Sequence, residues 1–123
     1  MDKMNKVASK SKITLVIKES MQKELRERLA ADGYGLKEKS RWVAEAIEQL
    51  LNSENYPALV EISQQMSCFN KKDSIDISPT LKAKLEKAVL KVRKKYPILD
   101  GVQSCIVRTA IIQRFIRGYN KIN

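Results

Sequence analysis

The sequence predicts a mostly α-helical fold with one short two-stranded antiparallel β-ribbon, because the 123-residue chain repeats one order of elements twice. Ser40–Gln49 recurs 64 positions later as Ser104–Gln113, with identical residues at five of ten positions. Ahead of each copy stands a stretch of alternating apolar residues, which is typical of a half-buried strand. A lone strand leaves its backbone donors and acceptors unpaired, so the two strands must pair with each other or with strands of another chain.

In the first copy, the alternation over Lys12–Ile17 indicates a strand. Ser20 is expected to cap a helix that ends at the glycine-containing turn 32–35. Ser40 is expected to cap a second helix that runs to about Leu51. The apolar faces predicted for these helices comprise Met21, Leu25 and Leu29, and then Val43, Ala46, Ile47, Leu50 and Leu51.

In the second copy, Ser74–Ile77 is a short strand and Ser78-Pro79 begins a helix, because proline at a first helical position costs no hydrogen bond. Tyr96-Pro97 ends that helix. Ser104 is expected to cap the last helix, which continues to Gly118. The apolar faces predicted here comprise Leu81, Leu85, Ala88, Val89 and Val92, and then Val107, Ala110, Ile111 and Phe115.

The predicted organisation is two similar units that form one compact domain. Residues 1–10 are expected to be a disordered basic arm, and residues 11–52 form unit 1. Residues 53–71 form a linker, which includes a short helix over Pro57–Met66. Residues 72–118 form unit 2. The ribbon's inner face is expected to bury Ile13, Leu15, Ile17, Ile75 and Ile77.

The charge balance favours a nucleic-acid partner, with an anionic membrane surface second. The chain holds 24 Lys and Arg against 14 Asp and Glu, a net charge of +10, and residues 74–123 alone hold 11 basic and 3 acidic residues. There is no histidine, which removes the commonest general base and metal ligand. Two cysteines make neither a four-cysteine zinc site nor a disulfide framework. We therefore expect a cytoplasmic protein. We also expect no metal, no cofactor and no catalytic site.

Two sets of segments carry a resemblance to a known family. The first set is Ile13–Met21, Gly35-Leu36 and Ser40–Ile47, and the second is Ile75–Leu81 with Ser104–Ile111. Their order resembles the ribbon-helix-helix DNA-binding proteins of the Arc/MetJ/CopG superfamily, and the tandem arrangement resembles the double ribbon-helix-helix proteins of plasmid-transfer and T-DNA-processing systems. The resemblance implies a pseudo-dimer within one monomeric chain, with higher oligomers on DNA as an option.

The resemblance also implies where DNA would be contacted. Base edges in the major groove would be read by outward residues of the ribbon, namely Lys12, Thr14, Val16, Lys72, Ser74 and Asp76. Phosphates would be bound at the starts of the second helices, by Lys37, Lys39, Ser40, Arg41, Ser104 and Cys105. The alternatives are that the first set is the solvent side of a half-exposed sheet and that the serines only cap helices. Asp76 departs from the family pattern, in which this position is neutral or basic.

Other residues receive simpler interpretations. Trp42 is expected in the core. Arg108, Arg114 and Arg117 add charge to the last helix and suggest a second, non-specific phosphate surface.

The expected function is sequence-specific, non-enzymatic binding of double-stranded DNA by a bacterial protein. Two roles fit: an accessory factor that works with a relaxase or a partition protein in DNA transfer or partition, as in a relaxosome, and a transcriptional repressor. The alternative is a protein-interaction or scaffold module whose basic surface serves an acidic partner. No membrane partner is expected.

Overall fold

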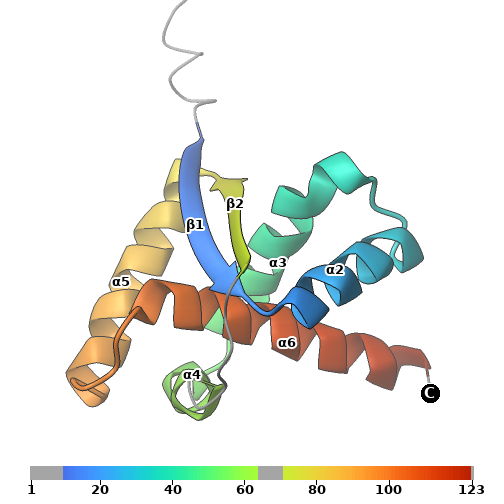
Figure 1. The fold of residues 1–123 in the computed structure, drawn as a ribbon. Helices are drawn as coiled ribbons and strands as arrows, with labels where there is room; N and C mark the ends of the chain where they lie inside the picture. Colours follow the sequence, from blue (N-terminus) through green and yellow to red (C-terminus); the bar gives the residue numbers. More distant parts are fainter. Residues whose placement is uncertain (1–9, 64–70, 123) are drawn as a thin grey trace, which may run out of the picture.

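The computed structural model describes residues 10–63 and 71–122. Within these residues, two strands and six helical segments follow one another (Figure 1). They are β1 (Ser11–Ile17), α2 (Glu19–Ala31), the 3-10 helix η1 (Leu36–Glu38), α3 (Lys39–Leu51), α4 (Tyr56–Ser63), β2 (Lys71–Ile77), α5 (Pro79–Lys95) and α6 (Val102–Ile122). The predicted fold class, mostly helical with a two-stranded antiparallel sheet, is confirmed in this form.

The two strands pair with each other within the chain. β1 and β2 are antiparallel, in a register that places Ile13 opposite Ile75 and Thr14 opposite Ser74. Residues opposite each other in an antiparallel pair lie on one face of the sheet. The inner face buries all five predicted residues, each with at most 3% of its surface exposed: Ile13, Leu15, Ile17, Ile75 and Ile77.

The helices of the two halves interlock around the ribbon. α3 follows β1 in sequence but packs against β2, while α6 follows β2 and packs against β1. α3 and α6 also pack extensively on each other, and Figure 1 shows α6 crossing beneath the end of the ribbon. The core therefore draws on both halves at once, and neither half encloses a core by itself.

The predicted apolar faces are largely the observed ones. Every predicted face residue is buried except Leu51 and Val89, which are half-buried against the same core. Trp42 is completely buried, as expected, and its indole Nε1–H donates to Asp32 Oδ2 at 2.8 Å. Ser78 caps α5, because its hydroxyl accepts from the Leu81 N–H at 3.1 Å.

Three predicted serine caps are wrong. α2 begins at Glu19, one residue before Ser20, and its N-cap Lys18 makes no side-chain cap. α3 begins at Lys39, because the 3-10 turn before it already leads the backbone into helical geometry, so Ser40 lies inside the first turn. α6 begins at Val102, two residues before Ser104.

The glycine before α6 explains that earlier start. Gly101 has φ +56°, a conformation that side chains with a Cβ seldom adopt, and its carbonyl accepts from the Cys105 N–H at 3.0 Å. The first intrahelical hydrogen bond is therefore already made at Gly101, and Ser104 has no cap to supply.

The predictions for the linker and for the start of the chain can be compared with the structure only at the described residues. α4 confirms the linker helix over residues 57–63, and it packs between α5 and α6. The rest of that predicted helix, residues 64–66, and residues 1–9 of the expected arm lie outside the described residues. β2 begins at Lys71, earlier than the predicted strand.

Candidate nucleic-acid interface

The outer face of the ribbon presents the six residues predicted to face outward. Opposite pairs along this face are Lys12 with Asp76, Thr14 with Ser74, and Val16 with Lys72. All are exposed except Val16, which is half-buried. Alternation along each strand separates this polar face from the apolar inner face. The face is narrow, with short side chains at its centre and charged ones toward its ends.

An ion pair across the two strands gives Asp76 a partner within the ribbon. Lys12 Nζ lies 3.9 Å from Asp76 Oδ1, with both side chains well exposed, at 68% and 49%. An exposed pair of this kind contributes little stability, but it neutralises part of the positive charge on the face. The pairing depends on strand register, which the sequence alone does not specify.

Two predicted phosphate contacts instead fasten α3 to β2. Lys39 Nζ lies 2.5 Å from Asp73 Oδ1, and the Ser40 hydroxyl accepts from the Asp76 N–H at 2.9 Å. Asp73 is largely buried, with 13% of its side chain exposed, so it holds the Lys39 cation close to the protein. These contacts give Lys39 and Ser40 a structural role, the positioning of the ribbon on α3.

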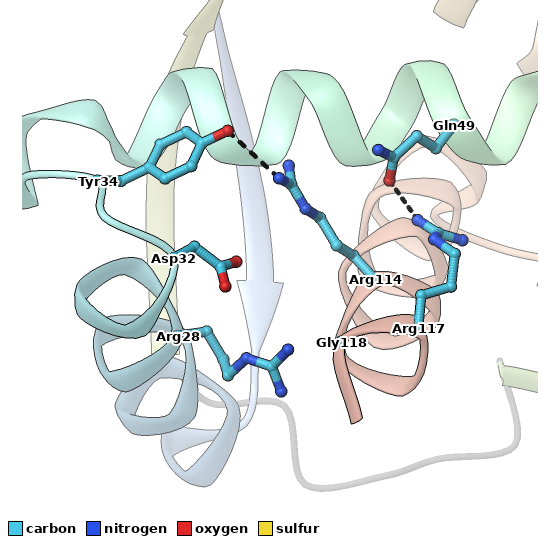
Figure 2. Close-up of a pocket in the computed structure, with 7 residues that line it drawn as sticks. All are labelled: Arg28, Asp32, Tyr34, Gln49, Arg114, Arg117 and Gly118. Carbon is cyan, nitrogen blue, oxygen red and sulfur yellow. Dashed lines mark hydrogen bonds between the residues drawn. The ribbon is translucent and has the colours of Figure 1, made fainter. Parts of the chain in front are cut away.

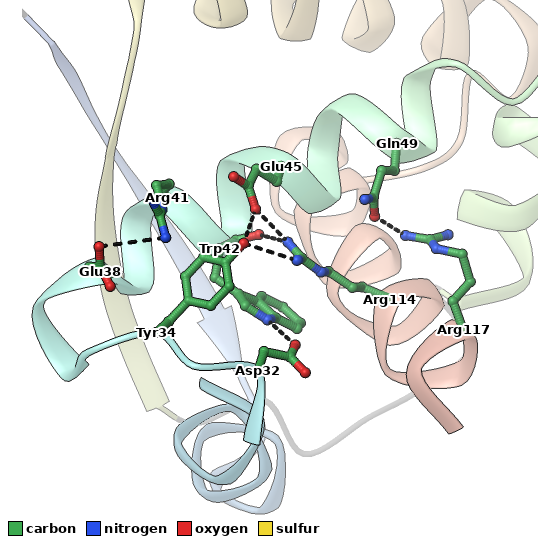
Figure 3. Close-up of polar contacts among 9 residues, drawn as sticks. All are labelled: Asp32, Tyr34, Glu38, Arg41, Trp42, Glu45, Gln49, Arg114 and Arg117. Atoms are coloured by element: carbon green, nitrogen blue, oxygen red, sulfur yellow. Dashed lines mark hydrogen bonds and ion pairs between the residues drawn. The ribbon is translucent and has the colours of Figure 1, made fainter. Parts of the chain in front are cut away.

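The other two candidates near α3 remain at the surface. Lys37 is exposed in the 3-10 turn. Arg41 is 57% exposed, its Nη2 lies 3.5 Å from Glu38 Oε2, and its guanidinium stacks 4.5 Å from the centre of the Tyr34 ring (Figure 3). The ring and carboxylate orient Arg41 and leave it accessible to solvent.

The start of α6 does not offer the predicted phosphate site at Cys105. Cys105 is 2% exposed, and its N–H is used by the Gly101 carbonyl. Its thiol donates to the Asp100 carbonyl at 3.8 Å, and its sulfur accepts from Arg108 Nη2 at 3.2 Å. Burial therefore removes Cys105 from the set of candidate phosphate contacts, whereas Ser104 beside it is half-buried.

Arg108 fastens α6 to β1, much as Ser40 fastens α3 to β2. It is 8% exposed, and its Nη1 donates to the Val16 carbonyl at 2.8 Å. Burial lowers the pKa of Arg108, and the neighbouring Cys105 opposes that shift. The expectation that Arg108 extends a solvent-facing phosphate surface is wrong, because its guanidinium points into the protein.

Arg114 and Arg117 also extend from α6 to α3. Arg114 Nη1 donates to the Trp42 carbonyl at 2.7 Å and to Glu45 Oε1 at 3.2 Å (Figure 3). Arg117 donates to Gln49. Burial lowers the pKa of Arg117, and repulsion from Arg114 lowers it further.

With Arg28 of α2, these two arginines line a cavity of about 630 Å³ between α2, α3 and α6 (Figure 2). The other lining residues are Asp32, Tyr34, Gln49 and Gly118. The sequence did not predict this cavity, because its residues come from α2 and the turn after it, from α3 and from α6, which are far apart in the chain.

A further basic surface runs along α5. Lys82 and Lys84 have carboxylate partners, Glu86 at 3.8 Å and Glu48 at 3.7 Å. Five other basic residues of the helix are exposed, namely Lys87, Lys91, Arg93, Lys94 and Lys95. Three of them lie in the last turn, where cations interact favourably with the helix dipole.

Metal and membrane chemistry find no support in the described part of the chain. Across residues 10–63 and 71–122, no three or more metal-ligating side chains gather in one place. None of the helices described combines the length and apolar character needed to cross a membrane.

Comparison with known proteins found no matching family model, no matching curated protein and no matching solved structure.

Proposed function

We propose that this protein binds double-stranded DNA by inserting the β1–β2 ribbon into the major groove. The observation that supports this proposal is the two-sided ribbon: one face is buried completely, and the other presents six outward residues of polar or mixed character. A major groove about 12 Å wide admits a two-stranded ribbon and displays a distinct pattern of donors and acceptors for each base pair.

The chemistry of the outer face suits base recognition. Thr14 and Ser74 stand opposite each other at the centre, where hydroxyls donate to or accept from any base edge. Lys12 and Lys72 stand at opposite ends and on opposite strands, where amines bind guanine O6 and N7. Asp76 accepts from cytosine N4 if DNA displaces it from Lys12. The two strands present different side chains, so the proposed site is not a true palindrome.

The exchange of partners between halves supports the proposal that residues 11–52 and 72–118 act as two ribbon-helix-helix units in a pseudo-dimer. Each second helix, α3 or α6, packs on the strand of the opposite half. Covalent joining of the halves would then supply one complete ribbon per chain. The proposed biological roles are those named above, an accessory factor in DNA transfer or partition, or a repressor.

Non-specific affinity would come from basic residues outside the ribbon. Lys37 and Arg41 lie exposed near the start of α3, and the exposed lysines and arginine of α5 add further charge. Contacts to phosphate fix the register of a protein on DNA without reading its sequence. We therefore assign base reading to the ribbon and general affinity to these flanking cations.

The test removes the two central hydroxyls without changing charge. The double variant Thr14→Ala/Ser74→Ala is compared with Ser20→Ala/Thr80→Ala, which removes the same two side-chain types from exposed positions in the first turns of α2 and α5. Sites are selected from random duplexes by the unaltered protein, and fluorescence anisotropy then measures binding to a selected and a scrambled duplex.

We expect the ribbon variant to lose about 1–3 kcal/mol of preference for the selected duplex per base contact removed, while its binding to the scrambled duplex changes little. The control variant should keep both affinities. If the unaltered protein binds no duplex at low salt but binds polyglutamate, the scaffold alternative replaces this proposal.

A further inference from the structure

We propose that the C-terminal half of α5 and the turn that joins it to α6 form a docking surface for an acidic, amphipathic segment of a partner protein. Apolar side chains project into solvent on this surface, and basic side chains surround them. Figure 1 shows this end of α5, and the turn after it, below the end of the ribbon. The surface is separate from the outer face of the ribbon, and the inference does not depend on DNA binding.

The apolar part of this docking surface contains two large side chains that the core leaves outside. Leu90 is 66% exposed and Ile98 is 92% exposed. Leu90 lies on the side of α5 that faces solvent, and Ile98 lies in the turn three residues before Gly101. Contact with a partner would remove both from water, which is favourable in proportion to the apolar area covered.

A groove of about 450 Å³ runs beside Leu90, between α5 and the start of α6. Val89, Leu90 and Val102 supply its apolar lining, and Arg93 supplies a cation. The first turn of α6 borders the groove, and backbone N–H groups in the first turn of a helix carry partial positive charge. The groove is therefore suited to an apolar side chain next to a carboxylate.

The charge around Leu90 favours an acidic partner. Residues 79–101, which comprise α5 and the turn, hold seven basic and two acidic residues. Lys87, Arg93 and Lys94 stand three or four positions from Leu90, so they lie around it on the helix surface, and all three are exposed. An acidic segment that covers Leu90 would thus meet cations on both sides of it.

The two acids of residues 79–101 reduce this positive charge only in part. Glu86 lies 3.8 Å from Lys82 Nζ, which offsets its charge. Asp100 is exposed at the far side of the turn from α5. Lys84 lies 3.7 Å from Glu48 and is engaged with α3. Within the segment itself, the exposed cations of the last two turns of α5 therefore dominate.

A protein segment matches both properties of the docking surface. Phosphates attract the cations but offer no apolar surface to cover Leu90 and Ile98. A lipid surface offers both anions and apolar chains, but it is too flat to fill a groove between two helices. An amphipathic helix that carries acidic side chains beside apolar ones can place its apolar face in the groove and its acids against the cations.

The experiment measures binding of labelled peptides to the full chain without DNA, by fluorescence anisotropy. The probe is a glutamate–leucine peptide of about 16 residues, with its leucines spaced to form one face of a helix. A second peptide has the same composition in scrambled order. Salt is held at about 0.15 M, where exposed charges more than about 8 Å apart are largely screened.

Two pairs of variants separate the apolar contribution from that of charge. Leu90→Ala/Ile98→Ala is compared with Leu36→Ala/Ile62→Ala, which removes the same two side-chain types at positions 70% and 61% exposed. Arg93→Gln/Lys94→Gln is compared with Lys23→Gln/Arg26→Gln, which makes the same charge change at exposed positions of α2. Circular dichroism melting of each variant confirms that folded chains are compared.

We expect saturable binding of the amphipathic peptide and much weaker binding of the scrambled one. Leu90→Ala/Ile98→Ala should weaken peptide binding about tenfold, because apolar area is no longer buried, and should leave binding to a random duplex unchanged. Arg93→Gln/Lys94→Gln should weaken peptide binding about fivefold, since each exposed ion pair contributes little. Each control variant should stay within about twofold of the unaltered protein.

Several results would overturn the inference. They include no saturable binding of the amphipathic peptide, equal binding of the scrambled peptide, and an equal loss in Leu36→Ala/Ile62→Ala. Vesicles that contain phosphatidylserine and light scattering of the chain alone test the other occupants. If Leu90→Ala/Ile98→Ala weakens vesicle binding or self-association and leaves peptide binding intact, the surface binds lipid or a second copy instead. A failure to bind any duplex would contradict the proposed function and leave this inference standing.

Discussion

At the scale of single residues, the outer face of the ribbon carries an ion pair between the two strands. Lys12 is the residue best suited to approach a guanine, yet its ammonium lies 3.9 Å from the Asp76 carboxylate. On the proposed function, DNA would have to compete with that carboxylate before Lys12 could bind a base. On the proposed function, Asp76 would therefore restrain the affinity of the ribbon for any duplex, whichever bases the ribbon reads.

This arrangement predicts that Asp76→Asn strengthens binding to random DNA. Asparagine keeps the size of the side chain and leaves the backbone N–H bonded to Ser40, while the lost charge releases Lys12. We expect the slope of log affinity against log salt to become steeper by about 0.9, the effect of one additional neutralised phosphate. Fluorescence anisotropy with a random duplex, at several salt concentrations, provides the measurement.

Asp100→Asn is the matched control, because it makes the same chemical change at an exposed position in the turn between α5 and α6. An equal increase in both variants would mean that only the net charge matters. A selected duplex adds a second readout: if Asp76 accepts from cytosine N4, specific affinity falls in Asp76→Asn while random affinity rises.

At the scale of elements, the second helices are attached to the ribbon by polar contacts as well as by the core. Ser40 and Lys39 connect α3 to β2, and Arg108 connects α6 to β1. The Arg108 contact is the more buried, since that residue is 8% exposed. A buried carbonyl that loses its donor costs more free energy than an exposed one, which water can satisfy.

Arg108→Met should therefore lower the free energy of unfolding by about 1–3 kcal/mol, because the Val16 carbonyl loses its partner while the side-chain stem is kept. Urea denaturation followed by circular dichroism measures the change. Arg93→Met, at an exposed position on α5, should lose less than about 0.5 kcal/mol. A loss in Arg108→Met no larger than in Arg93→Met would show that this contact contributes nothing.

The same elements show how much of the fold the sequence could predict. Periodicity predicted the buried faces, and Ser78-Pro79 predicted the start of α5 correctly, because proline and serine together specify a helix start. The predicted capping role of Ser40 was wrong. A serine near the start of a helix can form a hydrogen bond with a distant strand as readily as with its own helix, and only the fold shows which bond is made.

The candidate site was predictable to a smaller extent. Alternation alone indicated which residues face outward, since a strand has a fixed period of two. The Lys12–Asp76 pair and the cavity arginines depend on register and on helix packing across long separations. Arg108 was misjudged because charge predicts exposure in general, and a buried arginine is recognised only through the partners that compensate it.

At the scale of the whole molecule, one chain contains both strands of the ribbon and both helices that support it. Among the described residues, each strand therefore already has its partner within the same chain. A chain of this kind would present its proposed DNA surface at any concentration, whereas a surface shared between two separate chains is lost when they dissociate.

We expect the protein without DNA to have the mass of a single chain, 14.1 kDa, at micromolar concentration. Light scattering after size exclusion measures this directly. A mass of twice that value, unchanged on dilution, would contradict the monomeric state, and an obligate dimer whose strands pair only between chains would contradict intrachain pairing of the ribbon. Cross-linking between cysteines introduced at Thr14 and Ser74 gives an independent check, since these positions face each other in the register observed.

The ribbon register also has a consequence for how the chain acquires its structure. Every strand pair, from Ile17 with Lys71 to Ser11 with Ile77, spans α2, α3 and α4 in sequence, so no local hairpin turn can bring the strands together. Closing so long a loop costs entropy that only the assembled helices repay, and contacts between distant positions slow folding. During synthesis β1 leaves the ribosome long before its partner strand exists. The ribbon should accordingly be among the last parts to order, and refolding monitored at β1 should follow the slowest phase of helix packing.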